Sequence, residues 1–199
     1  IADIDVIAAA PKHMTAAGYA DLAAKVPAGA EWMIADFVGS EPIQDDAWHV
    51  LQDYLDDFLA DPSGVAAGDP GAVADLFEGL TLSGFAMQAA RSSRPASCCD
   101  HLFSHLLDMT GHRYNGKLQS HGYQVAIGTL TMCAVFDELF KHDLTSVDVE
   151  ACVEAWPTLE QEQERALDVF AGSPAPKLGY GMITQKYGDK EAVRAEMTR

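Results

Sequence analysis

The feature that most constrains the fold is a helical spacing of apolar residues that recurs along almost the whole chain. Between Asp69 and Ala90, apolar side chains follow one another every three or four residues, after an Asp-Pro pair that suits a helix start. A similar amphipathic stripe runs from Asp45 to Leu59. Apolar and acidic residues alternate only at positions 1–7, which we expect to form one short entry strand. The sequence therefore predicts an all-α protein of eight or nine helices.

Glycine and proline set most of the other predicted boundaries. A helix that starts at Pro11 is expected to break at Gly18, before a second helix that runs to Lys25. A further helix ends at Gly39, and residues 64–71 form a glycine- and alanine-rich loop. The remaining predictions are helices at 97–110, 121–140, 147–156 and 158–170, a polar loop at 110–116 and a connector at 177–188. The helix at 121–140 is apolar nearly all round and is expected to be buried and central.

Charge and composition exclude several classes of protein. The net charge of −17 opposes binding to nucleic acid or to an anionic membrane. There is no run of about 18 apolar residues, so no transmembrane helix is expected, and no secretory signal is recognisable. Four cysteines, two of them adjacent, do not make a disulfide framework and favour a reducing, cytoplasmic location.

The stretch from Ser93 to His105 contains the most residues that could bind a metal or take part in catalysis. A proline stop there is followed by Ser97, a good helix cap, and then by two histidines four residues apart. In a helix that starts near Cys98, His101 and His105 lie one turn apart on the same face. Both can bind a metal, or one can bind it while the other handles protons. The alternative is that one is a buried, hydrogen-bonded core histidine and the other is exposed.

Asp21 and His121 are the other candidate metal ligands. Asp21 lies near the expected start of an alanine-rich helix, where the helix dipole alone would favour a carboxylate. His121 opens the predicted central helix, where a role as a helix cap is the alternative. The other histidines lie in loops or on polar faces and are predicted to be solvated: His13, His49, His112 and His142.

The cysteines are not predicted to form a metal or redox site. Vicinal cysteines rarely chelate one metal together, so Cys98 and Cys99 are interpreted as helix N-terminal residues with a lowered thiol pKa. Cys133 and Cys152 are expected in the core. The sequence has no glycine-rich nucleotide-binding motif, phosphate loop or nucleophile elbow, and its histidine helix lacks the glutamate of a His-Glu-x-x-His protease.

Three segments, within residues 1–135, carry a family resemblance. They are Ala8-Ala9-Ala10-Pro11 with Met14, Ala17-Gly18-Tyr19-Ala20-Asp21-Leu22, Lys25 and Glu31-Trp32; Leu82-Ser83-Gly84-Phe85-Ala86-Met87 with Ser93-Arg94-Pro95-Ala96-Ser97, Asp100-His101 and His105; and His121-Gly122, Gln124-Val125 and Gly128-Thr129. This pattern resembles sn-glycerol-1-phosphate dehydrogenases, in the superfamily of iron-containing alcohol dehydrogenases and dehydroquinate synthase. The chain departs from the family pattern at Ala20 and Tyr123, and at Cys98-Cys99, where the family has glycine and a small residue.

The resemblance implies a helical domain of the dehydroquinate synthase type in which Asp21, His101 and His121 hold a divalent metal. Zinc is the first expectation, with nickel or iron as alternatives. The family likeness further implies that Asp21 and His105 contact the substrate, and His105 is a hypothetical catalytic proton relay. The implied reaction is the NAD(P)H-dependent reduction of dihydroxyacetone phosphate to sn-glycerol 1-phosphate, in which the metal polarises the carbonyl.

The resemblance also implies that residues 1–199 form one helical metal- and substrate-binding domain of a longer protein. The family's nucleotide-binding domain and C-terminal tail have no counterpart in this sequence, so we expect NAD(P) to bind through a separate domain. A polyol phosphate substrate and a homo-oligomer are expected. Two alternatives stay open: another superfamily enzyme, such as a polyol dehydrogenase or a dehydroquinate-synthase-like cyclase, and a helical interaction module without catalysis.

Overall fold

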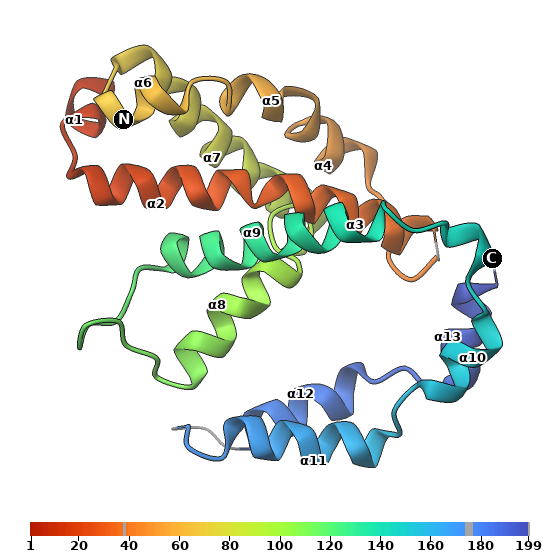
Figure 1. Cartoon of the computed structure of the whole chain (residues 1–199). Coiled ribbons are helices and arrows are strands. Elements are labelled where there is room, and N and C mark those ends of the chain that lie inside the picture. The colour runs from red at the N-terminus through yellow and green to blue at the C-terminus, as the bar shows by residue number, and fades with distance from the viewer. Residues whose placement is uncertain (38, 174–176, 199) are drawn as a thin grey trace. The chain divides into compact units, whose positions relative to one another are not determined.

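The computed structural model describes residues 1–37, 39–173 and 177–198 (Figure 1). Within these ranges the regular secondary structure is helical, apart from an isolated bridge between Tyr114 and Lys117. The predicted all-α class is therefore confirmed. The chain divides into two compact units, the first made of Ile1–Ser104 and Gln119–Phe136, the second of His105–Leu118 and Asp137–Arg199.

Helices that lie in the first unit, or begin in it, are α1 (Ile4–Ala8), α2 (Lys12–Ala23), α3 (Lys25–Phe37), α4 (Asp45–His49), η1 (Gln52–Tyr54), α5 (Leu55–Phe58), α6 (Pro62–Ala67), α7 (Pro70–Ala90), α8 (Cys99–Met109) and α9 (His121–Leu139). The second unit contains the ends of α8 and α9, together with η2 (Leu144–Ser146), α10 (Val149–Ala155), α11 (Leu159–Phe170), α12 (Leu178–Lys186) and α13 (Lys190–Met197). Here α11 packs against α12, and α10 against α13.

The predicted entry strand is wrong, because Ile4–Ala8 form helix α1. The side chain of Asp3 accepts hydrogen bonds from the backbone N–H groups of Asp5 and Val6, at 3.1 and 3.3 Å, and so caps the first turn. A strand would need a neighbouring strand for its backbone groups, and the described part of the chain contains none. A local cap therefore outweighs the alternating pattern.

Three other predicted breaks are also helical, and two of them add helices that the sequence did not predict. Helix α2 continues through Gly18, where a β-carbon would lie 3.3 Å from the Leu80 side chain on α7, so the glycine serves packing rather than a break. The predicted loop at 64–71 contains most of α6, which Asp61 caps through the N–H of Gly64 at 2.7 Å. The predicted connector at 177–188 contains α12.

The long helix predicted after Asp69 is confirmed as α7, and it forms one wall of the main core. The Asp69 carboxylate accepts from two backbone N–H groups of the first turn. The amphipathic stretch at 45–59 is broken into α4, η1 and α5; Leu51 and Leu55 of its apolar stripe are buried, whereas Tyr54 is 53% exposed. Residues from α2, α6, α7 and the 45–59 stretch build the core cluster: Leu22, Leu51, Leu55, Val65, Ala72, Leu76 and Ala86. Leu22 is fully buried, which fixes the α2 segment that carries Asp21.

Helix α9 is not buried on all sides as predicted, because its apolar face is exposed at Ile127 (54%) and Leu130 (72%). Its opposite face is packed tightly through two glycines. A β-carbon on Gly122 would overlap the backbone carbonyl of Ala17 on α2, and one on Gly128 would overlap that of Asp100 on α8. The α9 backbone therefore lies directly against both helices.

We predict that Gly128→Ala lowers the free energy of unfolding by about 1–3 kcal/mol, because the added methyl group forces α9 away from α8. Gly84→Ala is a control within α7, since apart from the adjoining backbone of its own helix no atom lies within 4 Å of its β-carbon position. That substitution should raise stability by roughly 0.5–1 kcal/mol, as expected for an unhindered helical glycine. Urea denaturation followed by circular dichroism measures both. Equal effects of the two substitutions would contradict the close packing of α9.

Candidate metal centre

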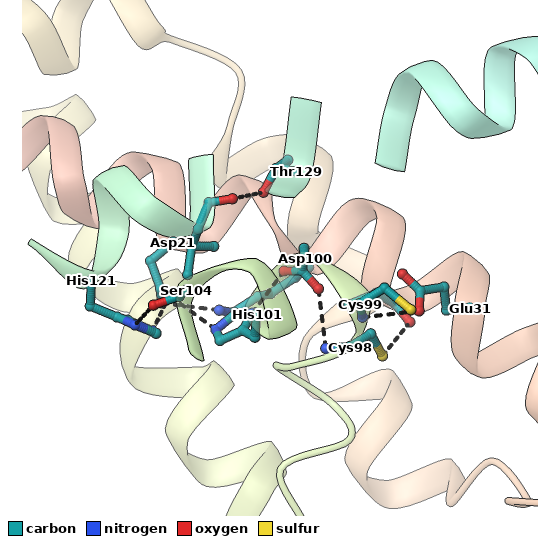
Figure 2. A network of polar contacts seen from close by, with 12 residues as sticks. Asp21, Glu31, Cys98, Cys99, Asp100, His101, Ser104, His121 and Thr129 are labelled. Atoms are coloured by element: carbon teal, nitrogen blue, oxygen red, sulfur yellow. Dashed lines mark hydrogen bonds and ion pairs between the residues drawn. The ribbon is translucent and has the colours of Figure 1, made fainter. Parts of the chain in front are cut away.

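Three helices bring together the three residues expected to bind a metal (Figure 2). Asp21 lies near the end of α2, His101 in the first turn of α8, and His121 is the first residue of α9. The Asp21 Oδ1 atom lies 3.4 Å from His101 Nε2 and 3.6 Å from His121 Nε2. One potential ligand atom from each residue lies within 4.8 Å of the other two.

This arrangement bears on the alternatives for each residue. Asp21 is close to the C-terminal end of its helix, where the dipole disfavours a carboxylate, so the N-terminal dipole explanation is wrong. His101 is buried and hydrogen-bonded, as a core histidine would be, but its Nε2 is also directed at Asp21. The His121 side chain is 53% exposed, so the cluster is open towards solvent on that side.

His105 lies one turn after His101 in α8, and its side chain is exposed. It belongs to the second compact unit, whereas the three clustered residues belong to the first. Its assignment as a substrate contact and proton relay therefore stays a prediction.

The outer nitrogen of each clustered histidine is held by a second residue. The Nδ1 atom of His101 lies 2.7 Å from Oδ2 of Asp100, a fully buried carboxylate. The Nδ1 atom of His121 lies 2.9 Å from the hydroxyl of Ser104, which donates to Oε1 of Gln124 at 2.7 Å. Such outer contacts orient histidine ligands in metal proteins. Sequence reasoning missed all three supporting residues, although Asp100 immediately precedes His101.

Asp21 is oriented in a similar way. Its Oδ2 atom accepts from the ammonium group of Lys25 at 3.0 Å, one helical turn further along, and Lys25 is only 1% exposed. Thus Oδ2 is engaged with the lysine while Oδ1 is directed at the histidines. The cluster presents one carboxylate oxygen and two imidazole nitrogens, a donor set that suits zinc and other divalent transition metals. The residues present therefore fit the implied metal.

Comparison with known proteins identifies the family. No family model matches the chain. Its curated relatives include glycerol-1-phosphate dehydrogenases [NAD(P)+] from Bacillus licheniformis (30% identical over 76% of this chain and 38% of the relative), Hyperthermus butylicus (38% identical; 71% and 40%) and Pyrococcus horikoshii (37% identical; 66% and 37%). The chain belongs to the glycerol-1-phosphate dehydrogenase family. It spans about two fifths of the length of these relatives.

The thiols of the adjacent cysteines, where the sequence departs from the family pattern, have raised pKa values. Burial raises the pKa of both Cys98 and Cys99 to about 12, and a hydrogen bond with Glu31 adds to the effect on Cys99. The predicted lowering of their pKa is therefore wrong, because desolvation outweighs the helix terminus. Cys133 and Cys152 are exposed, which contradicts their predicted place in the core.

The other predictions about polar residues agree with the structure. All four histidines expected to be solvated are exposed: His13, His49, His112 and His142.

In the part of the chain that the structure describes, no helix is long and apolar enough to cross a membrane.

Electrostatics couple Asp21 to His101. Burial alone would raise the pKa of Asp21, but its hydrogen bond with His101 and the charge of Lys25 outweigh burial and lower this pKa from 3.8 to about 2. Burial alone would lower the pKa of His101, but hydrogen bonds with Asp100 and Asp21 outweigh it and raise this pKa above 6.5. In metal-free protein, the two groups therefore attract each other most strongly when Asp21 is ionised and His101 is protonated.

This coupling predicts how the stability of the metal-free protein depends on pH. The contribution of Asp21 is fully present above its unfolded-state pKa of 3.8 and is lost as pH falls towards 2. The contribution of His101 is fully present below 6.5 and is lost as pH rises through its raised pKa. The difference in melting temperature between the parent protein and Asp21→Asn, measured with a chelator present, should therefore be largest between pH 3.8 and 6.5. A difference that does not change with pH would contradict this coupling.

Proposed function

We propose that this chain is the metal- and substrate-binding part of an NAD(P)-dependent glycerol-1-phosphate dehydrogenase. The observation that carries the proposal is the convergence of Asp21, His101 and His121 from three helices. In each of them, the polar atom that faces away from the cluster, Oδ2 or Nδ1, contacts another residue. The names of the relatives favour glycerol 1-phosphate over the substrates of other superfamily enzymes. Zinc is the proposed metal, with nickel or iron as alternatives.

Each candidate residue is assigned a role in the proposed reaction. Asp21, His101 and His121 would hold the divalent cation, whose Lewis acidity polarises the carbonyl of dihydroxyacetone phosphate when bound. NAD(P)H, bound by another part of the protein, would supply the hydride, and the carbonyl oxygen would need a proton to give the secondary alcohol. We propose that His105 contacts the substrate and relays that proton, as its place one turn after His101 and the family resemblance suggest. Asp21 is the second proposed substrate contact.

Binding of the nucleotide is assigned to another part of the protein, since this chain carries no glycine-rich nucleotide motif. A homo-oligomeric state and a cytoplasmic location are also proposed. The cytoplasmic location is supported by cysteines that form no disulfide framework and are all unpaired among the described residues. The strongly negative net charge supports a small-molecule substrate over nucleic acid.

The metal prediction can be tested on the chain itself. Purified protein supplied with zinc and then desalted should retain about one equivalent, whereas Asp21→Asn should retain much less, because an amide is a weaker ligand than a carboxylate. His13→Gln is the control, since His13 is exposed and outside the cluster. Elemental analysis by mass spectrometry measures the content. Equal zinc in the parent protein and Asp21→Asn would contradict the site and favour a non-catalytic helical module.

The reaction can be tested on the gene product that contains this chain. It should oxidise NADH or NADPH with dihydroxyacetone phosphate and form the sn-1 rather than the sn-3 isomer of glycerol phosphate. His105→Gln should lower turnover at least tenfold, as expected for loss of general acid–base catalysis, and keep the parental zinc content. Parental turnover in His105→Gln would reject the proton relay. Activity with only glycerol, or with a dehydroquinate precursor, would instead favour the other superfamily enzymes.

A further inference from the structure

We propose that Asp100 and Ser104 are positioning residues that fix His101 and His121 in the tautomer with hydrogen on Nδ1. Each ring then directs the lone pair of Nε2 towards Asp21 Oδ1 (Figure 2). The inference rests on the proposed function, since it assigns these two residues a role in holding the metal ligands.

The contact of Asp100 determines the tautomer of His101. A carboxylate only accepts hydrogen bonds, so the 2.7 Å contact between Asp100 Oδ2 and His101 Nδ1 requires hydrogen on that nitrogen. The protonated ring donates to both Asp100 and Asp21. When the ring is neutral, its one hydrogen stays at the shorter contact, with Asp100, so Nε2 carries the lone pair 3.4 Å from Asp21 Oδ1. The other carboxylate oxygen, Oδ1, accepts from the backbone N–H of Cys98 at 3.1 Å, which holds the carboxylate in place.

The contact of Ser104 acts on His121 through a chain of two hydrogen bonds. The Ser104 hydroxyl donates its only hydrogen to Gln124 Oε1, at 2.7 Å, so towards His121 Nδ1 it can only accept. The 2.9 Å contact therefore also requires hydrogen on Nδ1. Ser104 is fully buried and lies on α8 one turn after His101, so one helix positions both rings.

The two residues differ in how strongly they act, and this difference makes the inference testable. In Asp100→Asn, the N–H of Cys98 keeps the amide oxygen on its side, so the amide NH₂ group faces His101 Nδ1. That group donates, which moves the ring hydrogen to Nε2 and removes the lone pair meant for the metal. Ser104→Ala merely removes an acceptor from His121 Nδ1 and puts no donor in its place. Asp100→Asn should therefore be the more damaging change.

The test combines two measurements on the purified chain. Nitrogen-15 NMR of the metal-free protein, at alkaline pH where the rings are neutral, reports the tautomer of each histidine. Competition with a chromophoric chelator reports zinc affinity. We expect hydrogen on Nδ1 of both histidines in the parent protein, hydrogen on Nε2 of His101 in Asp100→Asn, and a loss of zinc affinity of about 10–100-fold in that variant. Ser104→Ala should lose less affinity and show mixed tautomers of His121.

Matched controls are Asp57→Asn and Ser63→Ala, which make the same changes at exposed positions of the first unit and should leave both readouts unchanged. Hydrogen on Nε2 of either histidine in the parent protein would overturn the inference even if both variants failed to fold. Parental zinc affinity in a folded Asp100→Asn variant would also overturn it, while leaving the proposed metal site intact. Absence of zinc binding by a parent protein with both Nδ1 tautomers would count against the proposed function and leave the positioning contacts standing.

Discussion

The close approach of the α9 backbone to α2 and α8 is the constraint on which the candidate site depends. Gly122 and Gly128 have no side chains, so α9 rests against the carbonyl groups of Ala17 and Asp100. His121 immediately precedes the first of these glycines, and Asp100 immediately precedes His101. The contacts that hold the helices together therefore also set the separation of the histidines, whose ring centres lie 5.1 Å apart. The packing of α9 against α2 and α8 therefore determines the relative positions of the candidate metal ligands.

The buried charged residues around the site each have a partner within the same network of contacts. Lys25 and Asp100 are almost completely buried, a position that costs several kcal/mol for an ion without partners. Lys25 is paired with Asp21, and Asp100 accepts from both His101 and the backbone of Cys98. Since each ion is matched by a partner directed at the cluster, the site is ordered by the protein's own contacts. Preorganisation of this kind allows binding energy to go to the ligand rather than to rearrangement.

Sequence periodicity predicted the helical class and helix α7, because burial of one helical face leaves a regular pattern. It failed where a specific contact determines the secondary structure. The cap provided by Asp3 stabilises a helix in a stretch with an alternating pattern. Gly18 lies within a helix because Leu80 packs beside it. The grouping of Asp21 with His101 and His121 was predicted from the family resemblance, since residues 80 to 100 positions apart in sequence leave no periodic signal. Ser104 was missed because an isolated serine within an apolar helix has no distinguishing pattern.

The adjacent cysteines show why the chain can depart from its family beside the site. The turn before α8 is tied down largely by backbone groups: the N–H of Cys98 donates to Asp100, and the N–H of Cys99 donates to Glu31 Oε2 at 3.1 Å. The glycine and small residue found here in the family would supply the same two donors. The Cys98 thiol adds contacts with the Arg94 guanidinium at 3.0 Å and with the carbonyl of Ala28 at 3.5 Å. The cysteine side chains thus add packing between this turn and α3, next to the backbone contacts that orient Asp100.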